Sequence, residues 1–119
     1  MKKDTSVFIK HILESIERIE EYVKEISEKQ FFEETQVQDA IIRRIEIIGE
    51  ATKNLPNGFR KKHSEVPWNE ITGARDKLIH GYFGVDLDLT WDIVKKDLPE
   101  LKKKVEKILK EIEETKDKK

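Results

Sequence analysis

The stretch TSVFIKHILESIERIEEYVKEIS, residues 5–27, decides the fold class of this chain. Its apolar residues recur every three or four positions, which is the period of one face of an α-helix. They are Phe8, Ile9, Ile12, Leu13, Ile16, Ile19, Val23 and Ile26. Most of the other positions are polar or charged, so the stretch predicts an amphipathic helix with one face against a core.

The helical period returns after a break. The segment EKQFFEE, residues 28–34, interrupts the pattern, and we expect a loop that packs its two phenylalanines onto the core. Thr35 and Gln38 have the spacing of a capping box. They predict the start of a second helix that runs to about Leu55, before a Pro-Asn-Gly sequence ends it.

Two further long helices follow, with a turn and a short helix between them. Pro67 suits the first position of a third helix over residues 68–80. We expect a turn at GYFGVD (81–86), a short helix capped by Asp88, and a last helix that Asp97 caps together with a glutamate three positions on. The apolar stripe of that last helix is Leu101, Val105, Ile108, Leu109 and Ile112.

These patterns predict an all-α bundle of four longer helices plus one or two short helices, built as a single domain over residues 1–119. The tail from about residue 115 should fray. The sequence has no Cys, which fits a reducing compartment, so we expect a cytoplasmic protein. It has no signal-peptide pattern and no apolar run of about 20 residues, so we expect no membrane span.

The charges are dense but balanced. Lys and Arg number 24 against 25 Asp and Glu, for a net charge of −1, which excludes a polybasic nucleic-acid binder. The middle third, residues 40–80, has eight basic and five acidic side chains, so its net charge is +3. A polyanion would prefer this region.

The basic third ends in the motif RDKLIHGYF, residues 75–83. Arg75 offers a planar fork of donors that matches a phosphate, and His80 can exchange a proton near neutral pH. Asp76 and His80 are four apart, so on one helix the carboxylate can orient the imidazole. Together these groups suit RNA cleavage through a ribose 2′-hydroxyl, which needs no metal ion.

The same residues also have ordinary explanations. His80 could cap the end of the helix, Arg75 could be a surface ion-pair partner, and Tyr82 could be a core aromatic residue with an exposed hydroxyl. The reaction is best served by two acid–base groups, and the motif has one histidine. A two-fold dimer that pairs this helix with its mate would supply two histidines and two arginines.

Other basic residues have two interpretations. Arg44 falls within the apolar stripe of the second helix, where it either extends to solvent and pairs with a carboxylate or reaches the cleft to contact phosphate. The patch of Arg60, Lys61 and Lys62 is either a solvated turn or an extension of the phosphate-binding surface.

Several remaining residues have structural roles in this interpretation. Arg43, Glu46 and Glu50 lie on the polar face of the second helix and should form surface ion pairs, or contact a partner. Gly49 in mid-helix marks a close helix crossing. Two tryptophans, Trp68 and Trp91, should lie in the core. The sequence has no set of residues with metal-ligand spacing, so we expect no metal and no cofactor.

With its flanking segments, the motif resembles the HEPN superfamily, and the Tyr two positions after the His is similar to HepT-type toxins of HepT/MntA toxin–antitoxin systems. The likeness extends to QDAIIRRIEIIGEATKNLP (38–56), VPWNEITGARDKLIHGYFGVD (66–86) and LTWDIVKKDLPELKKKVEKIL (89–109), in the same order. It covers about 75 residues.

The resemblance implies a dimeric HEPN bundle with a composite cleft and a metal-independent endoribonuclease activity on RNA. It implies that Arg75 and His80 are the catalytic pair and that Asp76 is the polar residue following the Arg. Tyr82 matches the tyrosine that an MntA-like nucleotidyltransferase antitoxin modifies with AMP, which silences the toxin. The chain shows no departure from the motif.

Two alternatives remain. One is a non-catalytic helical module that binds a nucleotidyltransferase, which the near-neutral net charge favours. The other is a nucleotide-binding sensor in which Arg75 and the basic patch hold phosphates.

Overall fold

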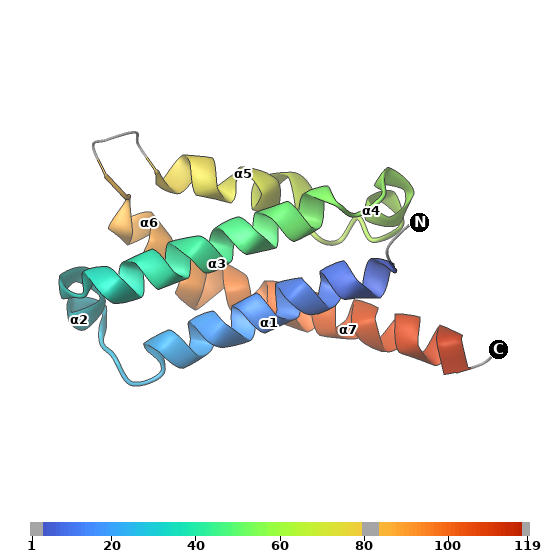
Figure 1. Cartoon of the computed structure of the whole chain (residues 1–119), viewed down its shortest axis with the longest axis horizontal. Helices are drawn as coiled ribbons and strands as arrows, with labels where there is room; N and C mark the ends of the chain where they lie inside the picture. Colours follow the sequence, from blue (N-terminus) through green and yellow to red (C-terminus); the bar gives the residue numbers. More distant parts are fainter. Residues whose placement is uncertain (1–3, 80–83, 118–119) are drawn as a thin grey trace.

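The computed structural model describes residues 4–79 and 84–117, and in this part of the chain the fold is all-α, as expected (Figure 1). Four longer helices carry the bundle, and short helices join them. The elements are α1 (Thr5–Val23), α2 (Glu28–Glu33), α3 (Thr35–Lys53), α4 (Asn57–Lys62), α5 (Trp68–Leu78), α6 (Leu87–Asp92), a π-helical turn η2 (Ile93–Asp97) and α7 (Leu98–Asp117). No helix of these residues is long and apolar enough to cross a membrane.

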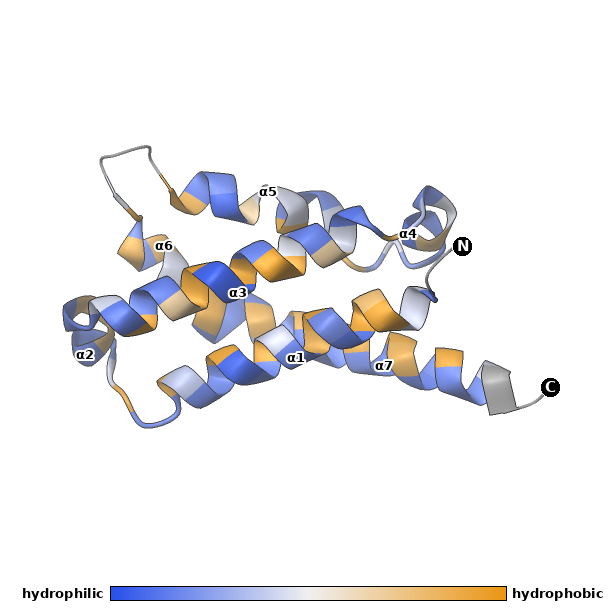
Figure 2. Ribbon diagram, viewed as in Figure 1, coloured by the Kyte–Doolittle hydropathy of each residue, from blue (hydrophilic) through white to orange (hydrophobic). Residues whose placement is uncertain are grey.

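The core lies where α1 packs against α3 and α7. The predicted stripe of α1 points into it, and Ile9, Ile12, Ile16 and Ile19 are fully buried. Figure 2 shows the apolar residues of the long helices on the faces turned towards one another. Helix α5 packs against the far side of α3, so α3 lies between α1 and α5.

The prediction of a loop over residues 28–34 is wrong, because most of this segment forms α2. Ser27 caps this helix in a capping box with Gln30. The capping box expected at Thr35 is also wrong: α3 starts without a side-chain cap, and Gln38 Nε2 donates to the Phe31 carbonyl at 2.9 Å. Six residues are too few to show a helical period, and Phe31 is buried as expected.

The last two helices form one continuous rod through η2. The side chain of Asp86, not Asp88, caps α6 by accepting a hydrogen bond from Leu89 N. The expected cap at Asp97 is wrong, because that residue lies inside η2, where no new helix begins. Helix α7 continues to Asp117, so the tail is helical up to that residue.

Helix α5 ends two residues earlier than predicted, at Leu78. Ile79 has an extended backbone and forms an isolated antiparallel bridge with Val85. Gly84 has φ +104°, in the left-handed region that favours glycine. The helical spacing that would set Asp76 beside His80 therefore stops before His80, which lies outside the described residues.

The expected close crossing at Gly49 is present where α3 meets α5. A Cβ atom at this position would lie 3.6 Å from Ile71 O and 3.8 Å from Thr72 O. Backbone of α5 therefore lies against this side of α3. Both tryptophans, Trp68 and Trp91, are buried as predicted.

Candidate functional site

Arg75 is the motif residue whose surroundings the structure defines best. It lies in the last turn of α5, and 46% of its side chain is exposed. Its Nε donates to Glu46 Oε2 of α3 at 3.0 Å. Its Nη1 lies 3.6 Å from Asp76 Oδ1, whose side chain is 82% exposed. The guanidinium is thus held by Glu46 at Nε and lies near Asp76 at Nη1, on a side chain that is half-exposed.

Glu46 lies between two arginines. Arg43 Nη1 donates to its Oε1 at 2.6 Å, so each carboxylate oxygen has one arginine partner. The hydrogen bond from Arg43 lowers the pKa of the Glu46 carboxyl below its ordinary value of 4.5, and the charge and hydrogen bond of Arg75 lower it further. The predicted surface pair of Arg43 and Glu46 is confirmed. The link from Glu46 to Arg75 was not predicted.

His80 and Tyr82 fall within residues 80–83, outside the part of the chain that the structure describes. Both described ends of this segment are anchored at the end of α5. Ile79 pairs with Val85, and Asp86 N donates to Leu78 O at 2.8 Å. The described residues on both sides of 80–83 therefore lie close to the last turn of α5.

The other basic candidates lie elsewhere on the described surface. Arg44 is half-buried and makes none of the hydrogen bonds or ion pairs found among the described residues. Two positions from Glu46, it lies about 160° around α3, so it is turned away from Arg75. Its interpretation as a side chain that extends to solvent fits this position, but the structure gives it no carboxylate partner.

The predicted basic patch belongs to the short helix α4. Arg60 donates through Nη2 to Asn57 Oδ1. Trp68 Nε1 donates to the carbonyls of Arg60 at 3.1 Å and His63 at 3.0 Å, which ties α4 to the start of α5. Arg60 and Lys61 line an open hollow there, and Lys62 is exposed beside it. The hollow starts roughly 10 Å along α5 from Arg75.

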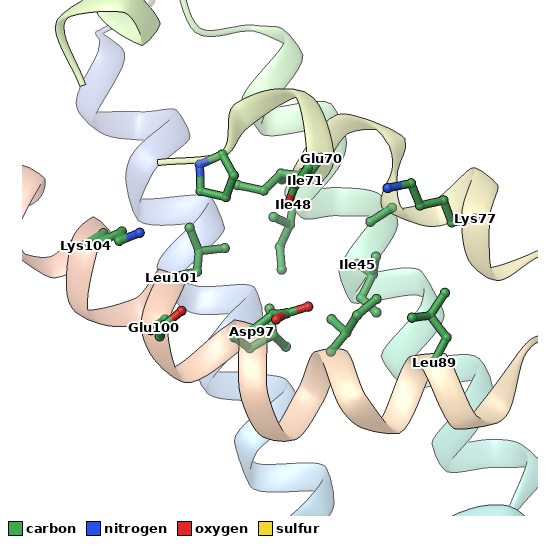
Figure 3. A pocket seen from close by; sticks show the side chains of 14 residues that line it. Ile45, Ile48, Glu70, Ile71, Lys77, Leu89, Asp97, Glu100, Leu101 and Lys104 are labelled. Carbon is green, nitrogen blue, oxygen red and sulfur yellow. The ribbon is translucent and has the colours of Figure 1, made fainter. Parts of the chain in front are cut away.

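A second hollow of about 260 Å³ lies between α3, α5 and the α6–α7 rod. Its floor is apolar, with Ile45, Ile48 and Ile71 among the lining residues. Figure 3 shows Lys77 and Lys104 at opposite ends of it. The described residues of its lining include no histidine, and among residues 4–79 and 84–117 no group of His, Cys, Asp and Glu could hold a metal ion.

A family model and the related proteins both indicate the same family. The family model "Ribonuclease HepT-like" matches residues 12–108. A protein of Thermococcus cleftensis named "Probable ribonuclease HepT" is 49% identical over 110 residues, which are 92% of this chain and all of that protein. A "Putative RNase" of Caldanaerobacter subterraneus is 51% identical over 102 residues, which are 86% of this chain and 91% of that protein.

Another relative is a longer protein. The "Gamma-glutamylcyclotransferase and putative RNase" of Methanocaldococcus jannaschii is 56% identical over all 119 residues of this chain, which spans only 54% of that relative's length. No solved structure matches the chain. The match to the family model covers most of the bundle, and the relatives align over most or all of the chain. The chain therefore belongs to the HepT-like ribonuclease family.

Proposed function

We propose that this protein is an endoribonuclease that cleaves RNA by attack of a ribose 2′-hydroxyl, without a metal ion. The observation that carries the proposal is the arrangement at Arg75. Its guanidinium donates to Glu46 through Nε and belongs to a side chain that is 46% exposed, in a chain whose relatives are named as RNases. The Nη1–Nη2 edge of an arginine matches two phosphate oxygens.

In the proposed reaction His80 removes the proton from the 2′-hydroxyl, and that oxygen attacks the adjacent phosphorus. Arg75 stabilises the charge of the phosphorane. The bond from phosphorus to the 5′-oxygen then breaks, and an acid protonates the leaving oxygen. The products are a 2′,3′-cyclic phosphate and a 5′-hydroxyl, and the proton count balances.

The protein is proposed to act as a homodimer through the motif helix. Each chain has one histidine in the motif, and the reaction uses a base and an acid. Arg75 and Asp76 are both exposed at the end of α5, which leaves this end accessible to a second copy. A heterodimer of one wild-type and one His80→Ala subunit keeps a single motif histidine, so it should lose most of its cleavage although one of its two subunits is intact. A heterodimer that keeps half of the wild-type rate would contradict a shared cleft.

The activity is proposed to be controlled by an MntA-like nucleotidyltransferase that attaches AMP to Tyr82. Each attached nucleotide adds a negative charge two residues from His80, where RNA phosphate must bind. Tyr82→Phe should cleave RNA and resist inactivation by that enzyme. An adenylylated protein, identified by mass spectrometry, that cleaves as fast as the unmodified one would refute this control.

Basic residues of α4 are proposed to extend the RNA-binding surface. Arg60 and Lys61 line the open hollow beside the start of α5, roughly 10 Å along that helix from Arg75, and Lys62 follows them in α4. Their removal should weaken RNA binding and reduce its salt dependence without changing the product ends. Arg44 is a weaker candidate, since it is turned to the other side of α3.

The deciding experiment is incubation of RNA with the purified protein in EDTA, beside Arg75→Ala and His80→Ala. Both variants should lose cleavage and remain folded. Arg18→Ala is the matched control, because Arg18 is similarly exposed at 51% and lies on α1. Cleavage retained in both motif variants would refute the residue assignment. A folded, unmodified protein that does not cleave would favour the non-catalytic module that binds a nucleotidyltransferase.

A further inference from the structure

Glu46 forms the ion pair that joins α3 to α5, the one such pair between these helices in the described chain. Its partners are 29 residues apart in sequence and meet because the backbones approach closely at Gly49. The three side chains of Arg43, Glu46 and Arg75 are 65%, 33% and 46% exposed. Exposed pairs of this kind contribute little to stability, typically ~0–1 kcal/mol. Their contribution to the fold is therefore small.

For RNA binding, the direction in which the pair holds the Arg75 guanidinium is more important than the stability that the pair adds. Glu46 accepts from Nε of Arg75 and leaves Nη2 without a recorded protein partner in the described residues, while Nη1 is 3.6 Å from an exposed aspartate. An arginine held at Nε keeps the donor pair that binds phosphate bidentately. The carboxylate thus fixes the direction of the guanidinium without occupying the edge that RNA needs.

Arg43 supplies the charge balance. It holds the second oxygen of Glu46 at 2.6 Å. Arg43 and Arg75 are positive and Glu46 and Asp76 are negative, so the four groups together have no net charge. Without Arg43 the cluster would be negative and would repel a phosphate, so Arg43 offsets the carboxylate that lies 3.0 Å from Arg75 Nε.

We propose that Glu46 is a positioning residue for RNA cleavage, which holds Arg75 with its Nη1 and Nη2 atoms presented to the scissile phosphate. The inference rests on the proposed function. Misplacement of a reacting group by about 1 Å can lower the rate by ~10²-fold. Glu46→Ala is therefore expected to lower kcat about 10- to 100-fold and to change KM less than about 3-fold.

Single-turnover and steady-state cleavage of one RNA by a matched set of variants tests this role. Glu46→Gln keeps an acceptor for Nε and should recover part of the lost kcat. Glu50→Ala is the control, because Glu50 lies on the next turn of α3 and pairs with Lys53, not with α5. In an Arg75→Ala background, Glu46→Ala should cause no further loss. Unchanged or increased cleavage by Glu46→Ala, or an equal loss in Glu50→Ala, would overturn the proposal.

A second measurement separates this inference from the proposed function. The Nε–H proton of Arg75 should give a resolved NMR signal in the wild-type protein and in Glu46→Gln, and should lose it through solvent exchange in Glu46→Ala. An unchanged signal in Glu46→Ala refutes the positioning role whether or not the protein cleaves RNA. A wild-type protein that shows the expected signals without cleavage refutes the proposed function alone.

Discussion

Replacement of Gly49 by alanine is expected to stabilise the protein, although the position is buried at the crossing of α3 and α5. Alanine in mid-helix is favoured over glycine by about 0.8–1 kcal/mol. The added Cβ would lie 3.6 Å or more from the nearest backbone atoms of α5, which is ordinary van der Waals contact. The gain is therefore close to the full propensity difference, about 1 kcal/mol.

This gain can be expressed as a melting temperature. At about 2.1 cal/mol/K per residue, the unfolding entropy of a chain this long is roughly 250 cal/mol/K, so Gly49→Ala should raise Tm by about 4 °C. Thermal unfolding followed by circular dichroism measures this shift. A variant that melts below the wild type would mean that the added methyl group clashes with the backbone of α5 in spite of the 3.6 Å separation. That result would refute the reasoning.

Gly49→Leu is the informative counterpart. The atoms beyond Cβ have no room, because carbonyl oxygens of α5 already lie at 3.6 and 3.8 Å from Cβ. Overpacking of this kind costs about 1–3 kcal/mol. Displacement of α5 would also draw Arg75 away from Glu46, so RNA cleavage should fall more steeply than stability. A leucine variant with wild-type Tm and cleavage would show that α5 does not depend on this contact for its position.

Three further results are expected. Trp68→Phe should lower the free energy of unfolding by about 1–3 kcal/mol in urea titrations, because it removes the indole donor from the carbonyls of Arg60 and His63, of which His63 O keeps only the hydrogen bond from Val66 N. No hydrogen bond of the Trp91 indole is found in the described chain, so Trp91→Phe should lose only packing. Ser27→Ala removes the capping box of α2 and should cost about 1 kcal/mol in the same titration; a change below about 0.3 kcal/mol would contradict the cap. The folded-state pKa of Glu46 is lowered, so its ion pairs stabilise the protein above a pH of about 4.5. This stabilisation is lost as the pH falls through the folded-state pKa, because Glu46 then becomes protonated. The difference in unfolding free energy between wild type and Glu46→Gln should therefore shrink below pH of about 4.5, and a constant difference would contradict the pairing.

Long helices with a wide apolar stripe could be predicted from the sequence because their signal repeats over several turns. Ile12 and Ile19 are two turns apart on α1, and both are fully buried. Helix α2 was missed because six residues hold less than two turns. The end of α5 was misplaced because a non-local contact decides it: Ile79 leaves the helix to pair with Val85.

The candidate site was predictable only in part, for a similar reason. Arg75 and Asp76 stand out as neighbours in a motif, and both prove to be exposed at the end of α5. Glu46 joins the site through a contact between two helices. The sequence pattern of α3 alone identifies it only as a residue of the polar face of that helix. Gly49 predicted a close crossing on α3, but no spacing within α3 or α5 shows that α5 is the helix that crosses there. The placement of His80 and Tyr82 remains a prediction.

Helix α5 has few buried residues, and this determines which part of the protein unfolds first. Of its eleven residues only Trp68 and Leu78, one at each end, are buried, whereas seven residues of α1 are. Segments with few buried residues unfold locally at a free energy below that of global unfolding. Amide protons of α5 should therefore exchange with solvent faster than those of α1, while the rest of the bundle stays folded. Since the open form releases Arg75 from Glu46, heating should abolish RNA cleavage several degrees before the bundle melts.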